Sequence, residues 1–151
     1  LGGGTVDLAG FVDGKPDGNY AISEKAALYC INRVIEEMVA RLGSSVPPIF
    51  IESFMRYGDY ECPDEYRIEI TKCLREYSSE IYDIIQSNNY NLDLTNMVFM
   101  GGGASIIQHF GNNKDRNVKF VTDVCANAKG CEEAVKSIMR ARRKIQNERT
   151  A

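Results

Sequence analysis

Two runs of three glycines are the residues of this sequence best suited to chemistry. The first run, Gly2–Gly4, is followed by Thr5 and Asp7, whereas the second, Gly101–Gly103, is followed only by small residues. Glycines let backbone N–H groups approach a phosphate or a flat ring without a Cβ in the way, and they permit the left-handed dihedrals of an anion-binding nest. A hydroxyl suits a phosphate, and a carboxylate suits hydrated Mg²⁺. The first run therefore predicts a phosphate site. The second run predicts a ligand that approaches the backbone closely, without charged side chains to bind it.

Other glycine-rich motifs and a purely structural role are the alternatives for these two runs. Neither run continues as Gly-Lys-Ser/Thr or as GxGxxG, which disfavours a P-loop kinase and a dinucleotide oxidoreductase. Either run taken alone is also compatible with a tight turn that binds nothing. Each run, however, follows an apolar strand or the place where one would be, and ligands of α/β sheets gather beyond the carboxyl ends of strands.

The patterning of apolar residues predicts strands interleaved with helices around the glycine runs. Strands are expected over residues 5–12, 49–51, 97–100 and 118–121. Helices are expected over about 22–42, 63–85, 106–110 and from 134 into 144. Turn-forming residues fill 13–19, and Pro47 and Pro48 interrupt the chain before residue 49. This order predicts an α/β sheet covered on its faces by helices.

Composition places the chain among ordinary soluble domains. It has 151 residues, of which 44% are hydrophobic and 26% charged, so it is long enough to bury a core as one domain. The net charge of −3 disfavours recognition of nucleic acid through bulk positive charge. No apolar run approaches the length of a membrane span. The protein is therefore expected to be soluble, with no membrane and no direct nucleic-acid partner.

Charge and cysteine patterns suggest two further expectations. From Lys136 onward six basic residues stand against one acidic residue, a charge of +5 that leaves −8 for the remainder. This tail is either a solvated helix end, where cations offset the helix dipole, or an arm that meets an acidic surface. The five cysteines lack CxxC spacing and the lone His109 offers them no zinc partner, so reduced intracellular thiols are expected.

The two glycine motifs resemble those of one ATPase superfamily. Leu-Gly-Gly-Gly-Thr-Val-Asp at 1–7 resembles the second phosphate loop of the actin, sugar-kinase and heat-shock-chaperone ATPases, and residues 98–104, Val-Phe-Met-Gly-Gly-Gly-Ala, resemble their adenosine motif. Residues 126–130, Ala-Asn-Ala-Lys-Gly, are similar to the second connecting motif of this superfamily. The order and spacing most resemble the ParM-like bacterial actins that segregate plasmids, over essentially the whole chain.

The resemblance implies a fold and a set of binding residues. The fold is an actin-like (ribonuclease H-like) α/β domain with a mixed central sheet flanked by helices, and residues 1–151 would be its second, carboxyl-terminal nucleotide-binding domain. The implied nucleotide-binding residues are Gly2, Gly3, Gly4 and Thr5 at the β- and γ-phosphates, and Gly101, Gly102 and Gly103 at adenine and ribose. Asp7 would act in catalysis through the shell of metal and water. Arg56 could reach the base or be only a solvated surface arginine.

The sequence also departs from the family pattern. The acidic residue of the phosphate motif would lie ahead of Leu1, and the first phosphate loop and first connecting motif are absent, which indicates a fragment lacking the amino-terminal domain. The segment 13–23 is shorter than the two-strand hairpin region expected in the family, which weakens the case for a third strand in this sheet. Residues of about 44–62 leave room only for a reduced outer subdomain, expected to be one strand and a loop.

The resemblance further implies a function, with two alternatives. The parent protein would be a cytoplasmic, filament-forming ATPase of the plasmid- or DNA-segregation type that binds ATP or GTP with Mg²⁺, other protomers and a DNA-bound adaptor. The 151-residue chain, as one wall of the nucleotide cleft, is expected to turn over ATP weakly or not at all. The alternatives are a sugar- or acetate-kinase-like phosphotransferase of the same superfamily and a non-catalytic protein-interaction domain.

Overall fold

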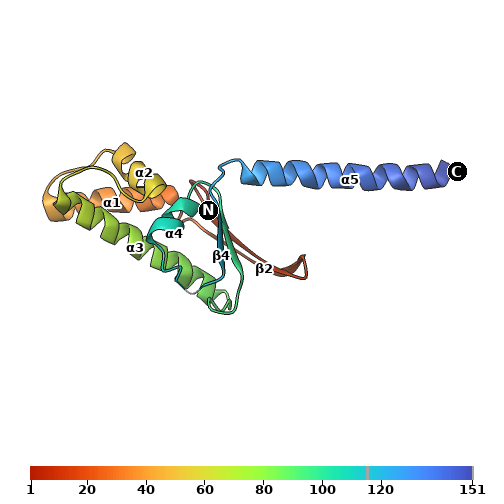
Figure 1. The fold of residues 1–151 in the computed structure, drawn as a ribbon, viewed down its shortest axis with the longest axis horizontal. Helices are drawn as coiled ribbons and strands as arrows, with labels where there is room; N and C mark the ends of the chain where they lie inside the picture. The colour runs from red at the N-terminus through yellow and green to blue at the C-terminus, as the bar shows by residue number, and fades with distance from the viewer. Residues whose placement is uncertain (115, 151) are drawn as a thin grey trace.

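The chain contains both helices and strands, which is consistent with the predicted α/β class. The computed structural model describes the backbone of residues 1–114 and 116–150 and the side chains of these residues as far as Arg143. The elements are β1 (Val6–Val12), β2 (Lys15–Ser23), α1 (Ala27–Leu42), α2 (Pro48–Tyr57), α3 (Asp64–Ser87), β3 (Met97–Met100), α4 (Ala104–Phe110), β4 (Val118–Val121) and α5 (Ala126–Thr150). Figure 1 shows α1–α4 gathered on one side of the strands and α5 projecting away from them.

The strands form two separate sheets rather than the expected single mixed sheet. Among the described residues, β1 pairs with β2 antiparallel, from Val6 opposite Ser23 to Val12 opposite Lys15, and β3 pairs with β4 in parallel. Leu1 lies beside the second pair, because its amino group donates to the Met100 carbonyl at 2.7 Å. One residue is too short to join the two pairs into one sheet.

The strand β2 corrects two expectations about residues 13–23. Turn residues were expected to continue to 19 and a helix to begin near 22. The turn contains only Asp13 and Gly14, with φ of 50° and 75°, the left-handed pair that a two-residue hairpin requires. Nearly every side chain of β2 is exposed, so the strand shows no alternation of apolar and polar residues. It is a strand only because its backbone pairs with β1. A search for alternating apolar and polar residues in the sequence could therefore not predict it.

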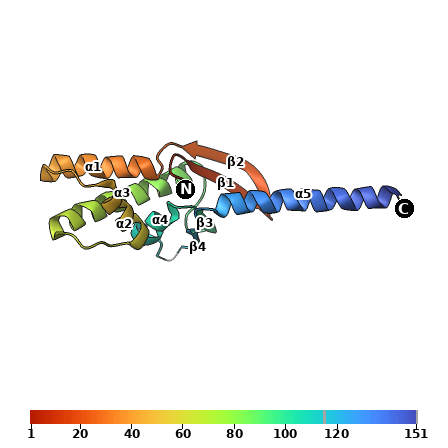
Figure 2. The same ribbon diagram turned by 90° about the horizontal axis from the view of Figure 1, so that it is seen from above.

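The core lies between α1, α3 and α4. Tyr77 of α3 and Val34 and Met38 of α1 are fully buried, as are Ile106 and Ile107 of α4. Cys30 and Cys73 are buried too, and all five cysteines, which lie within the described residues, are free thiols. The buried residues of each helix recur at helical spacing, so the helices pack together on their apolar faces. Figure 2 shows the arrangement of these helices from above. Burial of this surface supplies the main driving force for folding.

Residues 48–57 form the helix α2, not the strand and loop that were expected. Pro48 occupies the first helical turn, where its missing N–H costs no hydrogen bond. Ile51, Phe54 and Met55 are buried at helical spacing, and Gly58 ends the helix with a φ of 83°. The short apolar run 49–51 fits a strand equally well, because a run of this length has no distinguishing periodicity. Packing against α4 and α3 decides in favour of the helix.

The glycines that end α1 and α2 make a matched pair for a stability test. Gly43 and Gly58 both have positive φ, but a Cβ at Gly43 would meet nothing within 4 Å, whereas at Gly58 it would lie 2.8 Å from His109 Nδ1. We expect Gly43→Ala to lower the free energy of unfolding by about 1 kcal/mol through backbone strain alone. Gly58→Ala should cost about 1 kcal/mol more through the clash. Urea unfolding of both variants, alone and with His109→Ala, measures this, and a difference that persists without His109 would contradict the contact.

The last helix is longer and more isolated than predicted. It begins at Ala126, not near 134, and so includes the connecting motif 126–130 in its first turns. Every side chain from 127 to 143 is exposed, and both views show the helix leaving the rest of the molecule. Within the described part of the chain, none of the helices combines the length and the apolar character needed to span a membrane.

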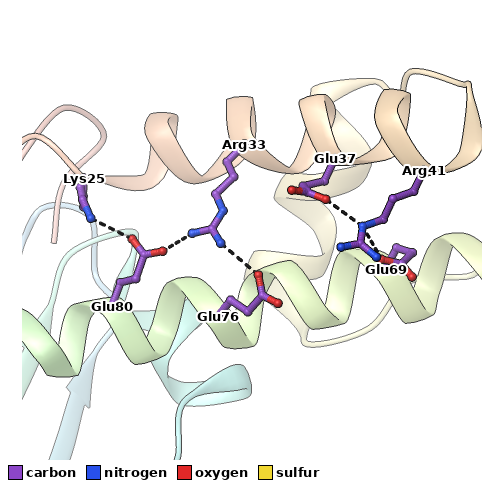
Figure 3. Close-up of polar contacts among 7 residues, drawn as sticks. All are labelled: Lys25, Arg33, Glu37, Arg41, Glu69, Glu76 and Glu80. Carbon is purple, nitrogen blue, oxygen red and sulfur yellow. Dashed lines mark hydrogen bonds and ion pairs between the residues drawn. The ribbon is translucent and has the colours of Figure 1, made fainter.

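A ladder of ion pairs bridges α1, together with Lys25 just before it, and α3 (Figure 3). Glu80 accepts hydrogen bonds from Lys25, at 3.1 Å, and from the Arg33 guanidinium, which also contacts Glu76 at 3.0 Å. Further along, Arg41 contacts Glu37 and Glu69 at 2.8 and 3.3 Å. These pairs are partly exposed, so each contributes little to the stability of the fold by itself. The contacts around Glu80 are the strongest part of the ladder, because one guanidinium, that of Arg33, pairs with both Glu80 and Glu76.

The pH dependence of stability tests the Glu80 part of this ladder. Burial raises the pKa of the Glu80 carboxyl, but hydrogen bonds from Lys25 and Arg33 outweigh it, so the pKa lies below its ordinary value of 4.5. Folding therefore favours the carboxylate, and this stabilisation is present above pH 4.5 and lost as the pH falls through the lowered pKa. We expect Glu80→Gln to cost about 0.5–1 kcal/mol at pH 7 and progressively less below pH 4.5.

Glu36→Gln serves as the control for Glu80, because Glu36 lies on α1 and is exposed. Urea unfolding at pH 7 and pH 3 should show no pH-dependent effect of this exchange. An effect of Glu80→Gln that is equal at both pH values would contradict the assigned ion pairs.

Candidate functional site

The first glycine run lies against the amino-terminal end of α1. The carbonyl of Gly2 accepts from the Ala27 amide at 3.3 Å, and the carbonyl of Gly3 accepts from the Leu28 amide at 3.1 Å. The Gly2 amide donates to the Thr5 carbonyl at 2.9 Å, which closes the turn. The amides of Gly3 and Gly4 donate to no described residue, and residues 2–5 are exposed. The turn therefore holds its carbonyls on the helix and leaves two amide donors free for a ligand.

Packing of the protein does not explain why residues 3 and 4 are glycines. A Cβ at Gly3 or Gly4 would meet nothing within 4 Å, and neither residue has positive φ. Side chains at these positions would instead extend into open space above the turn. This space is available to a ligand that approaches the backbone.

The second glycine run connects β3 to α4 and has two structural members. Gly101 has a φ of 93°, and a Cβ there would lie 2.8 Å from the Leu1 carbonyl oxygen. A Cβ at Gly103 would lie 2.1 Å from Leu1 Cδ2, and the Gly103 amide donates to the Leu1 carbonyl at 3.1 Å. Gly102 is exposed, and its Cβ would only touch Val124, at 3.4 Å. Gly101 and Gly103 therefore accommodate Leu1, and Gly102 is the member open to a ligand.

One cleft of about 830 Å³ receives a glycine from each run. Gly3 and Gly102 both line it, although they are far apart in the sequence, because Leu1 holds the two runs together. Its apolar lining consists of Ala27, Leu28, Ile31, Met55, Ile106 and Val124, and its polar lining of Glu52, Arg56, Ser105, Gln108, Thr122 and Asp123. An apolar wall with a few polar groups beside free amides suits a flat ring attached to an anionic group.

The remaining predicted site residues do not line this cleft. These are Gly2, Gly4, Thr5, Asp7, Gly101 and Gly103. The Thr5 hydroxyl donates to the Asp7 carboxylate at 3.1 Å, and both side chains are exposed. The described residues contain no cluster of three His, Cys, Asp or Glu that could hold a metal ion. A Mg²⁺ ion here would therefore take its other ligands from water and from phosphates, as Mg²⁺ commonly does.

Sequence reasoning missed several polar residues of the cleft. Glu52 lies one helical turn before Arg56 on α2, and both line the cleft, but residues 49–51 had been assigned to a strand. Thr122 and Asp123 directly follow β4. The signal for them was present, because β3 and β4 are parallel and residues after neighbouring parallel strands meet at one edge of the sheet.

Two of the polar residues are held by local contacts. Lys129 donates to the Asp123 carboxylate, whose other oxygen accepts from the Cys125 amide at 2.8 Å. These hydrogen bonds lower the pKa of Asp123, which is therefore an anion at neutral pH. His109 Nε2 lies 3.2 Å from the backbone carbonyl oxygen of Arg56 and links α4 to α2.

The comparisons with known proteins establish a likeness of fold. No protein-family model matches the sequence, and no curated protein matches it. Among solved structures, the chain is similar to Bacillus thuringiensis ParM, whose structure was determined with ATP. The TM-score is 0.56 and the sequence identity 15%, over 82% of this chain and 40% of that one. The chain therefore has an actin-like fold and spans about two-fifths of the length of that structure.

Proposed function

We propose that the cleft between the two glycine runs binds a nucleoside triphosphate, and that the chain is the nucleotide-binding half of an actin-like ATPase. The observation that carries this proposal is that Gly3 and Gly102, from separate runs, open onto one cleft. Gly3 presents a free amide to this cleft, whose lining is partly apolar and partly polar, and these features suit the phosphates and the base of a nucleotide. The likeness of fold to a protein solved with ATP supports the same conclusion.

The proposal assigns a role to each candidate residue. Gly2, Gly3, Gly4 and Thr5 bind the β- and γ-phosphates, with the unpaired amides of Gly3 and Gly4 as donors. Asp7 holds Mg²⁺ through water, and the ion would offset the negative charge of the phosphates. Gly102 lets the base and ribose approach the backbone, with Gly101 and Gly103 fixing the turn around it. Arg56 and Glu52 complete the polar edge of the base site.

Hydrolysis and assembly belong to the wider proposal. Phosphoryl transfer to water depends on positioning and on charge stabilisation around the phosphates, and this chain offers donors from one side of them. We infer that a second wall completes the ATPase and that the whole protein forms filaments of the plasmid- or DNA-segregation type, with an adaptor bound to DNA. The likeness to a ParM over two-fifths of its length supports this inference. The isolated chain is accordingly expected to hydrolyse ATP weakly or not at all.

Amide NMR shifts of the 151-residue chain test the binding proposal, because they detect affinities near 1 mM, or roughly −4 kcal/mol. Mg-ATP and Mg-GTP are expected to shift the amides of Gly3, Gly4 and Gly102 together. Inorganic triphosphate should shift only the first run, and adenosine only Gly102. Absence of shifts at both runs, or shifts confined to the basic helix α5, would overturn the proposal.

Light scattering of the whole protein with Mg-ATP tests assembly separately. A nucleotide-dependent rise in scattering is expected for a filament. A monodisperse sample that transfers phosphate to a small acceptor would instead favour the kinase-like alternative.

A further inference from the structure

One face of the strands β3 and β4 is largely apolar and exposed. Along both strands the side chains alternate between the core and the opposite face, and the parallel register places Val98 beside Lys119 and Met100 beside Val121 on that opposite face. The three apolar side chains expose between 37 and 54% of their surface. We call these four residues the outer face. Parallel strands are usually covered on both faces, whereas here α1–α4 gather on one side only (Figure 1).

The helix α5 carries an apolar stripe that is also uncovered. Val135, Ile138 and Met139 lie three and four positions apart, so they share one face of the helix, and each exposes between 52 and 55% of its surface. Figures 1 and 2 both show the helix clear of the other elements. Helices with an apolar stripe usually pack it against another element. The chain therefore presents two unpartnered apolar surfaces of similar kind.

The start of α5 is fixed at the end of β4, so the stripe cannot reach the outer face of its own chain. The Asp123 carboxylate accepts from the Cys125 amide at 2.8 Å and from the Lys129 side chain, and the Asp123 carbonyl accepts from the Ala126 amide at 3.0 Å. At a rise of 1.5 Å per residue, Val135 lies about 14 Å along the helix from its start. Folding back would break the helix, whereas a second copy of the chain can offer its stripe with α5 intact.

Charge favours contact of α5 with the body of a second copy over contact between two α5 helices. Residues 1–125 contain 11 basic and 18 acidic residues, a charge of −7. The described side chains of α5 carry +3, because five basic groups stand against Glu132 and Glu133. Two such helices side by side would repel each other, whereas the helix and the body attract. Lys119 is the cation of the outer face, and Glu132 lies one turn before Val135, where its carboxylate can pair with that lysine.

We propose that two copies of the chain form a reciprocal dimer, in which α5 of each copy packs its apolar stripe on the outer face of the other. A reciprocal contact has twofold symmetry, so the assembly closes as a dimer. Neither the stripe nor the outer face lines the nucleotide cleft. This contact therefore goes beyond the proposed function and requires no nucleotide.

Analytical ultracentrifugation of the chain without nucleotide tests the dimer. The concentration is raised to about 1 mM, which detects association free energies of roughly −4 kcal/mol. A reducing agent keeps the exposed Cys125 and Cys131 as thiols. We expect monomer and dimer in equilibrium. Ile138→Glu and Val98→Glu should each weaken the dimer at least tenfold, or about 1.4 kcal/mol, because each buries a carboxylate in the apolar contact.

Val39→Glu is the matched control, because it adds the same charge at a position of α1 that is 49% exposed and belongs to neither surface. It should change the dimer affinity less than twofold. Ile138 lies on the isolated helix, so its exchange leaves the core intact, and retained amide dispersion shows whether the Val98 variant is folded.

A mixture of the two interface variants tests which surfaces meet. Ile138→Glu chains keep an intact outer face, and Val98→Glu chains keep an intact stripe. The mixture therefore restores one of the two contacts, and it should associate more tightly than either variant alone.

Four results would overturn the proposal. A chain that stays monomeric up to about 1 mM forms no such dimer. A monomer whose Ile138 amide is protected from hydrogen exchange beyond the rest of α5 would mean that the helix folds back on its own chain. A dimer that is insensitive to Val98→Glu would mean that the α5 helices pair with each other. Binding of α5 to phosphatidylserine vesicles without a dimer would identify a membrane surface as the partner. None of these results bears on nucleotide binding, which is detected at Gly3, Gly4 and Gly102.

Discussion

Replacing Gly102 with leucine is expected to weaken Mg-ATP binding at least a hundredfold, or about 2.7 kcal/mol, with the fold retained. Gly102 lines the cleft, is exposed and lacks positive φ, and its Cβ would only touch Val124 at 3.4 Å. A leucine there adds three further carbons to the space that the proposal assigns to base and ribose. We expect the free energy of unfolding to change by no more than about 1 kcal/mol.

Gly130→Leu is the matched control for this exchange. Gly130 lies on α5, and a Cβ there would meet nothing within 4 Å. This variant should bind Mg-ATP as the original chain does, with a small gain in stability because leucine favours a helix over glycine. Calorimetry or amide shifts measure the affinity of both variants. Unchanged binding by Gly102→Leu would remove Gly102 from the site, whereas equal loss in both variants would indicate a general effect of leucine.

The largest effect on stability is expected from Phe54→Ala, at about 3–5 kcal/mol. Phe54 is completely buried on α2, and its ring centroid lies 6.4 Å from that of Tyr60. Because the side chain is buried, its removal leaves a cavity between α2 and the helices that pack against it. Total stabilities of small domains are about 5–15 kcal/mol, so this loss is a large fraction. The same helix carries Glu52 and Arg56 into the cleft, and nucleotide affinity should fall as well.

Phe11→Ala is the control for Phe54→Ala, because it removes the same side chain from an exposed position. Phe11 lies on β1 with 64% of its surface exposed, so its removal should change the free energy of unfolding by about 0.5 kcal/mol or less. Urea unfolding with comparison of m-values checks both variants. A cost below about 1 kcal/mol for Phe54→Ala would contradict its burial and the helix α2 itself.

A long helix with a one-sided apolar pattern and two short apolar strands were predicted correctly from the sequence. Helix α3 was expected from 63 to 85 and runs from Asp64 to Ser87, and strands 97–100 and 118–121 were predicted with their observed bounds. Pro63 and two acids mark the start of α3, and its buried residues recur every three or four positions. Such patterns carry enough local information to define an element before any packing is known.

Elements without that pattern were predicted wrongly. Strand β2 was missed because its side chains are exposed on nearly all positions, and residues 49–51 were taken for a strand because three apolar residues define no period. The single mixed sheet was also wrong, since sheet membership depends on which backbone edges meet. These features are decided by contacts between segments that are distant in sequence.

The sequence by itself predicted the two glycine runs as the binding residues, the first for a phosphate and the second for close approach of a ligand, because the conformational freedom of glycine is a local property. Only the tertiary structure decided which glycines are open to a ligand. Leu1 packs against Gly101 and Gly103 and leaves Gly102 and Gly3 on one cleft. It also brought Glu52, Arg56 and Asp123 to that cleft. The reason is physical: a backbone conformation follows from a few neighbouring residues, whereas a cleft is formed by surfaces that meet only when the chain folds.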